Sequence, residues 1–355
     1  MTAIETKPTD PLAFDFGLDF RPSSERAKGE RADRQSIGPK LLPYHVGFFD
    51  DYLRGITPHD LVLLGADSGV GKTDAVTEVA ERTVTNDGKR NVYMFALEAE
   101  PLEIERRIKY RRIARWLIER QHSLAREINY PDWYLGRFTS RLGAIEREAD
   151  EYMASLTGLH TYYKGKDFTG DDIHRLCLAV QDTADLIIID HLHYVDIADT
   201  DNENREYKKL VKVIRDTVLT TGRPILLVVH LRKGDGFREP LVPSLERIHG
   251  SSDIAKIATA AVMISRAPFA GREWHLAPTF LSVPKWRLGG ASRQVALCNY
   301  DLRTRSYLDE YTLGRLENGG KDWTEIHDSN RPPWARRYKA SGIELTTIAP
   351  TARKR

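Results

Sequence analysis

Short apolar runs, each bounded by polar or turn residues, alternate with longer segments of helical spacing along most of the chain. Runs of this length are typical of strands that are buried on both faces of a sheet. Strands that alternate with helices favour a mostly parallel sheet with helices on both faces. The predicted strands cover residues 61–64, 91–97, 159–163, 185–190, 224–229, 261–265, 280–285 and 293–300. The pattern therefore predicts an α/β fold.

The two ends of the chain and one internal stretch depart from this pattern. Residues 1–40 are polar apart from Asp15–Phe20, and residues 315–355 are polar with a basic end. Such segments bury too little apolar area to fold alone, so we expect a disordered or linker tail with one docking segment, and a flexible basic C-terminal tail. Within the domain between them, residues 41–314, the charged stretch at about 102–157 has helical spacing and predicts a solvated helical excursion.

Composition limits the class of protein without identifying it. The 355 residues are 41% hydrophobic and 29% charged, with a formal net charge of +2. A net charge this small means that any DNA-binding surface must be local. The two cysteines, Cys177 and Cys298, have no metal-ligand spacing, so a reducing cytoplasm is expected. The sequence shows no signal peptide and no apolar run long enough to cross a membrane.

The segment from Leu61 to Thr73 predicts a nucleotide site. An apolar strand leads into a turn of small residues and then a helix, an arrangement in which backbone N–H groups and a helix N-terminus bind phosphates. Lys72 would reach the β- and γ-phosphates of ATP, and the Thr73 hydroxyl would hold Mg²⁺. Ala66 stands where the usual pattern has glycine. The residues predicted to bind the nucleotide are Ala66, Ser68, Gly69, Val70, Gly71, Lys72, Thr73 and Asp74.

Polar residues follow several of the predicted strands. The carboxyl ends of parallel strands lie at one edge of the sheet, so Gly65, Glu98, Asp190 and His230 should converge there. Asp190 would hold Mg²⁺ through water beside Thr73, Glu98 could deprotonate the attacking water, and His230 could contact the γ-phosphate. Each has an ordinary alternative: the aspartate caps the next turn, the glutamate caps the next helix, and the histidine is a hydrogen-bonded strand-end residue.

Hydrolysis of ATP also needs positive charge at the γ-phosphate, often from an arginine of a neighbouring subunit. Lys285 and Arg287 are the candidates, because they lie on one face at the end of a strand that is followed by a glycine turn. A solvated hairpin tip would show the same pattern.

These segments together resemble the RecA-like motor domain of bacterial DnaB-type hexameric replicative helicases. The resemblance runs from about residue 45 to 305, and in that family alanine is common at the position of Ala66. The matching segments, in the order of the family, are residues 55–66 (GITPHDLVLLGA), 68–73 (SGVGKT), 95–99 (FALEA), 186–192 (LIIIDHL), 228–231 (VVHL), 247–252 (RIHGSS) and 285–289 (KWRLG).

The resemblance implies a role for each of these positions. Glu98 would be the catalytic base, His230 would sense the γ-phosphate at a position that is usually glutamine, and Lys285 and Arg287 would reach the ATP site of a neighbour in a hexameric ring. The loops after Asp190 and His230 would line a channel that holds single-stranded DNA, through backbone contacts with little base readout. The implied DNA contacts are Arg247, His249, Gly250 and Ser251, with Arg232 and Lys233 behind them.

Two features depart from the family. The polar N-terminal tail offers no counterpart of the helical domain that recruits primase, so the resemblance does not extend to primase recruitment. Thr259 replaces an acid expected before the strand that begins at Ala261. Both departures favour a plasmid, phage or mobile-element relative, or a divergent ATPase with another function.

Three functions remain open from the sequence. The first is a ring-forming ATP hydrolase that translocates on single-stranded DNA and unwinds duplex. The second is a RecA- or KaiC-like ATPase that assembles on DNA or on partners, for recombination, loading or defence. The third is an adaptor without hydrolysis that uses ATP as a switch.

Overall fold

The computed structural model describes residues 22–87, 90–165, 167–232, 240–249, 252–269, 271 and 273–341. Contacts divide the chain into two units, residues 1–41 and 42–355. The described part of the first unit is helix α1 (Ser23–Ile37), which buries none of its residues, and the short 3-10 helix η2 (Gly38–Lys40).

The prediction of a disordered tail is therefore wrong for Ser23–Ile37. The segment is rich in Glu, Ala, Lys and Arg, which favour helix, and the Glu30 carboxylate accepts a 2.8 Å hydrogen bond from Arg34 one turn later. The predicted docking segment, Asp15–Phe20, lies outside the described residues.

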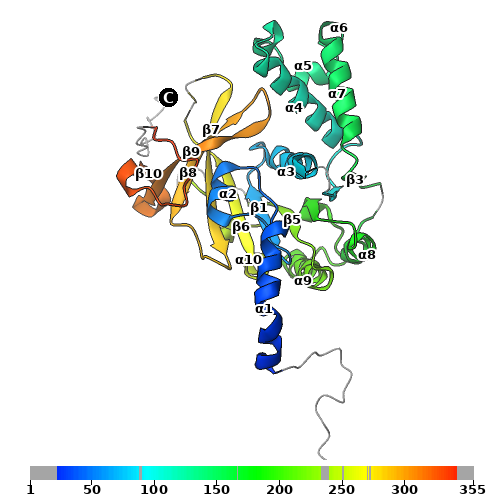
Figure 1. Cartoon of the computed structure of the whole chain (residues 1–355), viewed down its shortest axis with the longest axis vertical. Helices are drawn as coiled ribbons and strands as arrows, with labels where there is room; N and C mark the ends of the chain where they lie inside the picture. Colours follow the sequence, from blue (N-terminus) through cyan, green and yellow to red (C-terminus); the bar gives the residue numbers. More distant parts are fainter. Residues whose placement is uncertain are drawn as a thin grey trace, which may run out of the picture. The chain divides into compact units, whose positions relative to one another are not determined.

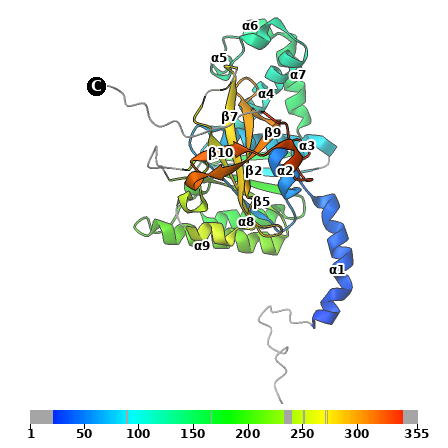
Figure 2. The ribbon, with the colours of Figure 1, turned by 90° about the vertical axis from the view of Figure 1, so that its left-hand side faces the viewer.

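One sheet organises the second unit (Figures 1 and 2), and its strand order is β10-β9-β8-β7-β6-β1-β5-β4-β2-β3. The strands from β6 to β3 are parallel, and β7 to β10 extend the sheet antiparallel. The bounds are β1 Leu61–Ala66, β2 Val92–Ala96, β3 Leu159–Tyr163, β4 Leu186–Asp190, β5 Ile225–His230, β6 Ala260–Arg266, β7 Leu276–Trp286, β8 Gln294–Asp301, β9 Ser306–Glu317 and β10 Asp322–Glu325. The predicted α/β core with a mostly parallel sheet and helices on both faces is confirmed.

Residues of β1 alternate between two apolar cores, one on each face of the sheet. Val62 and Leu64 pack with α2 (Gly47–Leu53) and α3 (Lys72–Asp87), whereas Leu61 and Leu63 pack with the helices of the other face. On that second face α8 (Gly170–Val180) and α9 (Glu203–Thr221) lie side by side (Figure 1), with α10 (Ser252–Ile257) beside α9. Burial on both faces explains the continuous apolar runs in the sequence.

Thr259 has a structural role at the start of β1. Its hydroxyl accepts a 3.0 Å hydrogen bond from the N–H of Leu61 and donates one of 3.0 Å to the carbonyl of the same residue. Because the backbone N–H of Thr259 also donates to that carbonyl, the residue ties the beginnings of β1 and β6 together.

The charged excursion is a small helical subdomain with a core of its own. It comprises α4 (Glu103–Glu119), η3 (Ser123–Arg126), α5 (Tyr130–Tyr134), α6 (Thr139–Leu142) and α7 (Ala144–Ser155). Helix α6 lies at its far end from the sheet (Figures 1 and 2). Its core includes Tyr110, Ile113, Leu117 and Phe138. Arg111 joins it to α3, because this fully buried guanidinium donates a 2.8 Å hydrogen bond to Glu81.

The prediction of a flexible tail from residue 315 is wrong as far as Ser341. Strand β9 continues to Glu317, β10 follows, and η7 (Asp328–Asn330) leads into a segment that packs against α2. Trp323 is fully buried, and its indole N–H donates a 3.1 Å hydrogen bond to the carbonyl of Val295. A few large apolar residues anchor this otherwise polar segment. Composition alone therefore placed the end of the folded domain too early, at residue 314. Residues 342–355 lie outside the described residues.

No described helix combines the length and the apolarity that a membrane crossing requires.

The C-terminal segment is anchored at Asp51 of α2, whose side chain is completely buried. The Asp51 carboxylate accepts hydrogen bonds from the Tyr311 hydroxyl at 2.8 Å, the N–H of Arg337 at 2.8 Å and the Arg337 guanidinium at 2.6 Å. We therefore expect Arg337→Ala to lower the free energy of unfolding by about 1–3 kcal/mol, because a buried charged acceptor loses a partner. Urea denaturation measures the loss. Lys339→Ala, which removes an exposed pair with Glu310, should change the stability by less than about 1 kcal/mol; equal effects of the two variants would contradict the proposed anchor.

Candidate nucleotide-binding site

A cleft of about 500 Å³ opens at the carboxyl ends of β1, β2, β4 and β5. It gathers residues from the P-loop, the strand ends and the turn between β8 and β9. Its lining is Ser68, Gly69, Gly71, Lys72, Thr73, Asp74, Glu98, Ala99, Glu100, Glu103, Arg107, Asp190, His230, Arg266, Tyr300, Leu302 and Arg305.

The P-loop occupies one side of this cleft. Strand β1 ends at Ala66, and α3 begins at Lys72, so the turn between them carries the helix N-terminus that binds phosphates. Gly69 and Gly71 have φ angles of 77° and 103°, which favour glycine. The Lys72 ammonium donates to the carbonyl of Ala66 at 3.0 Å and lies 3.1 Å from Nδ1 of His230. Val70 is buried, and its carbonyl accepts a 2.9 Å hydrogen bond from the Tyr307 hydroxyl.

Thr73 and Asp190 form a pair suited to Mg²⁺. Asp190 ends β4 and is only 4% exposed, and burial raises its pKa to about 6 although the Thr73 hydroxyl hydrogen-bonds to it. Its buried Oδ1 has no hydrogen-bond partner in the part of the chain that the structure describes. A buried carboxylate oxygen beside a hydroxyl is the kind of oxygen ligand that Mg²⁺ uses together with substrate phosphates, so these residues fit the ion.

The predicted base and sensor are joined by a residue that sequence reasoning did not assign. Oε2 of Glu98 lies 2.9 Å from Nε2 of His191, which in turn lies 2.6 Å from Nε2 of His230. Burial, with the neighbouring His230, His193 and Lys72, lowers the pKa of His191 to about 2. Burial and the Lys72 ammonium lower the pKa of His230 to about 4, so both rings are neutral at pH 7. The signal in the sequence was the histidine directly after the strand-end Asp190.

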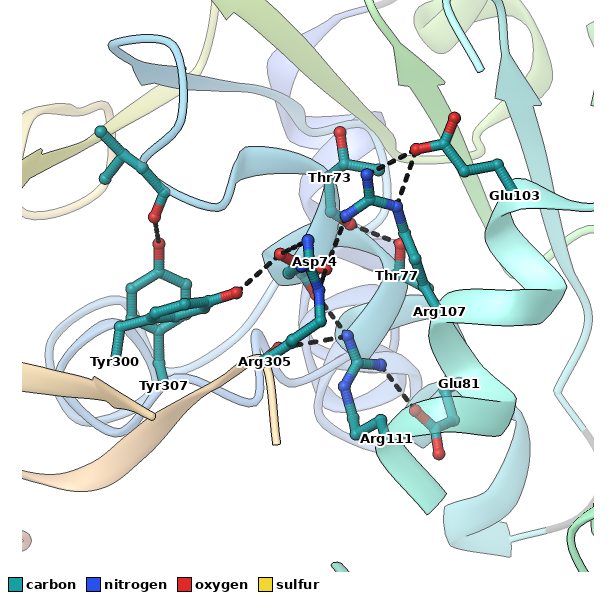
Figure 3. A network of polar contacts seen from close by, with 11 residues as sticks. Thr73, Asp74, Thr77, Glu81, Glu103, Arg107, Arg111, Tyr300, Arg305 and Tyr307 are labelled. Atoms are coloured by element: carbon teal, nitrogen blue, oxygen red, sulfur yellow. Dashed lines mark hydrogen bonds and ion pairs between the residues drawn. The ribbon is translucent and has the colours of Figure 1, made fainter. Parts of the chain in front are cut away.

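Asp74 lies in the cleft lining, but its carboxylate is held by other side chains (Figure 3). It accepts hydrogen bonds from Arg107 at 2.8 Å, from Arg305 at 3.0 and 2.8 Å and from the Tyr300 hydroxyl at 2.7 Å. Burial alone would raise the pKa of Asp74, but the guanidiniums of Arg305, Arg107 and Arg111 outweigh it and lower that pKa below its ordinary value. Sequence reasoning missed Arg107, Tyr300 and Arg305, since only the tertiary fold brings them together.

Lys285 and Arg287 lie at the opposite edge of the sheet. Lys285 pairs with Ala261 near the start of β6, whereas Gly65 and Ala66 pair with Met263 and Ile264 further along that strand. The Lys285 ammonium donates to the carbonyls of Ala255 and Lys256 at 2.6 and 2.8 Å, and Arg287 is exposed in the turn after β7. Neither residue therefore belongs to the cleft of its own chain.

The predicted DNA contacts lie around the end of β5. The Arg247 guanidinium donates to Asp67 of the P-loop turn at 3.0 Å and to the carbonyl of Arg232 at 2.8 Å. The N–H of His249 donates to the carbonyl of His230 at 2.9 Å, while the carbonyl of His249 lies 3.2 Å from Nε2 of His193. Arg232 is exposed. Lys233, Gly250 and Ser251 lie outside the described residues.

The sequence model of one family, described as the AAA domain, matches residues 49–236, which is more than half of the chain. The chain belongs to the AAA domain family. Its match begins in α2 and spans the P-loop, Glu98, Asp190 and His230, while the cleft residues from Arg266 to Arg305 lie outside it. No curated sequence matches the chain significantly.

Two solved structures share the fold of this AAA domain chain. One is described as an ATPase domain and is 13% identical to this chain. Its TM-score is 0.67, and the match covers 82% of this chain and 99% of that chain. The other is a DnaB-like replicative helicase, solved in a study of its interactions with primase, which is 14% identical, with a TM-score of 0.66 over 82% of this chain and 67% of that chain. The resemblance to a DnaB-type, RecA-like domain is confirmed for the fold.

The arginines around Asp74 predict a structural role for this acid in the AAA domain chain. Asp74→Asn should lower the free energy of unfolding by about 3–5 kcal/mol, because it removes the buried charge with which Arg107 and Arg305 pair. Denaturant unfolding without nucleotide measures the effect. Asp67→Asn is the control, since Asp67 is 41% exposed and its pair with Arg247 should contribute at most about 1 kcal/mol. If Asp74→Asn weakened ATP binding at unchanged stability, the carboxylate would belong to the binding site instead.

Proposed function

We propose that the chain is an ATP hydrolase of the DnaB type that forms a ring and translocates on single-stranded DNA. The proposal depends on one observation: Lys72, Thr73, Glu98, Asp190 and His230 come from four strand ends and surround one cleft. This set contains the groups that hydrolysis of a phosphoanhydride requires, which are a phosphate cradle, ligands for a cation and a base.

Each group has a separate task in hydrolysis. The N–H groups of the P-loop turn and the Lys72 ammonium would bind the phosphates of ATP, and Thr73 and Asp190 would hold Mg²⁺, which neutralises phosphate charge. Glu98 is 48% exposed and can reach a water molecule in the cleft. It would accept a proton as the water oxygen bonds to the γ-phosphorus and ADP leaves. His230, in contact with Lys72, would respond to the presence of the γ-phosphate.

The positions of Lys285 and Arg287 support a ring. They lie at the sheet edge opposite the cleft, so a head-to-tail arrangement of subunits can bring Arg287 of one subunit to the ATP of the next. The Arg287 guanidinium is exposed and therefore accessible to a neighbouring subunit. Because such an interface is heterologous, it closes into a ring when the rotation between subunits allows it, and a hexamer is our proposal.

Hydrogen bonds also connect the cleft to residues that are predicted to contact DNA. Asp67 of the P-loop turn pairs with Arg247, and His230 is hydrogen-bonded to His249 through the backbone. Both contacts link the nucleotide site to Arg247 and His249, two of the proposed DNA contacts. One of the similar solved structures is described as a replicative helicase, which agrees with a DNA substrate for this chain.

Hydrolysis is tested by ATP turnover with and without single-stranded DNA. Wild-type turnover should rise when single strands are added. Lys72→Ala should abolish ATP binding, and Glu98→Gln should keep binding but lower kcat by about 10²–10⁴-fold, because it removes only the base. Glu119→Gln, at an exposed glutamate of α4, is the control and should be active. Tight ATP binding with no turnover and no effect of Glu98→Gln would favour an ATP-switched adaptor.

Cooperation between subunits is tested by mixing two inactive variants. Lys72→Ala chains lack a working P-loop but carry Arg287, whereas Arg287→Ala chains have the P-loop and lack the arginine. If Arg287 acts on the neighbour, turnover should be low in each variant alone and should rise on mixing, because some interfaces then combine both working parts. Arg293→Ala, at another exposed arginine of the same hairpin, should be active alone.

No gain on mixing, with both variants assembled as oligomers, would contradict the shared site. Filaments on DNA without strand separation of a forked substrate would favour the RecA- or KaiC-like alternative over a helicase.

A further inference from the structure

Three side chains at neighbouring strand ends direct potential metal ligands toward one point. Glu98 follows β2, His191 follows β4 and His230 ends β5. One ligand atom from each lies within 4.8 Å of the other two. The closest approaches are 2.6 Å between the two histidine Nε2 atoms and 2.9 Å between Nε2 of His191 and Oε2 of Glu98.

The chemistry of this set differs from that of the Mg²⁺ pair. Mg²⁺ prefers oxygen ligands, as Thr73 and Asp190 provide, whereas two imidazoles and one carboxylate are a ligand set that Zn²⁺ uses with a fourth position open. Neutral imidazole is the form that binds a metal, and the His191 side chain is buried while that of His230 is partly buried. Glu98 is half-exposed, so the set is reachable from the cleft.

We propose that Glu98, His191 and His230 form a binding site for a divalent cation of the zinc type, and that occupancy of this site stops ATP hydrolysis. The inhibitory part rests on the proposed role of Glu98 as the base. A carboxylate oxygen that coordinates a cation is a much weaker proton acceptor, and a coordinated His230 is no longer free to follow the γ-phosphate. The site would thus bind the metal through the groups that hydrolysis needs.

The site requires a small adjustment of the two rings. With Zn–N bonds of about 2.0–2.1 Å and tetrahedral angles, two ligand nitrogens lie roughly 3.4 Å apart, so the 2.6 Å contact must open. Rotation of the His191 ring, which is 1% exposed, would open this contact and lengthen the 3.3 Å contact from the N–H of His193 to its Nδ1. His230 is only partly buried.

Local charge decides how tightly the cation binds. The carboxylates of Glu98 and Asp190 attract it, and the Lys72 ammonium, 3.1 Å from Nδ1 of His230, repels it. Lys72 also donates to Nδ1, which favours the proton on Nε2, the atom that must be free to coordinate. Removal of Lys72 should therefore strengthen binding of the metal even though it abolishes binding of ATP.

The test is a titration of the nucleotide-free, full-length chain with Co²⁺, followed by displacement with Zn²⁺. Wild-type protein should bind one Co²⁺ per chain with the intense visible absorption of a four-coordinate site. His230→Gln and His191→Gln should weaken Zn²⁺ binding by at least about tenfold, the lower limit for loss of even an outer-shell partner. His160→Gln, at an exposed histidine of β3, should bind as wild type, and Lys72→Ala should bind more tightly.

Wild-type affinity in His230→Gln, or the weak spectrum of six-coordinate Co²⁺, would overturn the site. His230→Gln is the safer of the two variants, because the position is half-open and glutamine is the residue usual in DnaB-type domains. The inhibitory part is measured separately, as ATP turnover at constant Mg²⁺ with and without Zn²⁺. Turnover should fall in wild type, return with a chelator, and fall less in His230→Gln; full turnover of zinc-loaded protein would overturn the inhibition.

The two proposals fail independently. If no variant or condition gave ATP turnover, the hydrolase would be wrong, while the Co²⁺ and Zn²⁺ affinities would still decide whether the metal site exists.

Discussion

The parallel pairing of β1, β5, β4 and β2 is the constraint on which the rest of the structure depends. Its register sets Ala66 beside His230 and Ala96 beside Asp190, so the P-loop, the predicted sensor, the acid for Mg²⁺ and Glu98 all emerge at one edge. A 2.7 Å hydrogen bond from the N–H of Leu97 to the carbonyl of Asp190 continues this pairing beyond the end of β2. A shift of one residue in any one of these strands would turn the side chains of that strand to the wrong face.

The charged side chains around the cleft form two separate groups. The first is the buried Asp74 with its arginines, which joins α3, the helical excursion and the turn between β8 and β9 (Figure 3). Arg305 of that turn also lies over the ring of Tyr130 in the excursion, 4.5 Å from its centroid. The second group contains Lys72, Asp190, Glu98 and the two histidines, and these residues face the proposed substrate. The first group holds the fold around the site, and the second contains the residues of the proposed reaction.

The two edges of the sheet carry different groups. The cleft lies at the carboxyl ends of the parallel strands, whereas the antiparallel β7 returns the chain to the other edge and carries Lys285 and Arg287 there. One strand reversal thus separates the residues of the cleft from Lys285 and Arg287, which lie away from the cleft of their own chain. This separation is why an assembly of several chains is the natural setting for the proposed reaction.

The sequence by itself determined the α/β core and the central residues of the cleft. The central residues could be predicted because each lies at or after the end of an apolar strand, and the carboxyl ends of parallel strands lie at one edge of the sheet. They are Lys72, Thr73, Glu98, Asp190 and His230. Each of these signals lies within a few neighbouring residues, so it can be recognised in a single sequence. Only the tertiary structure decided the partners of Asp74, the contact of His191 with both Glu98 and His230, and the packing of residues 315–341. Each depends on side chains that lie far apart in the sequence or on a few apolar anchors in a polar segment. Such contacts depend on register and packing, which no local pattern of hydrophobic and polar positions encodes.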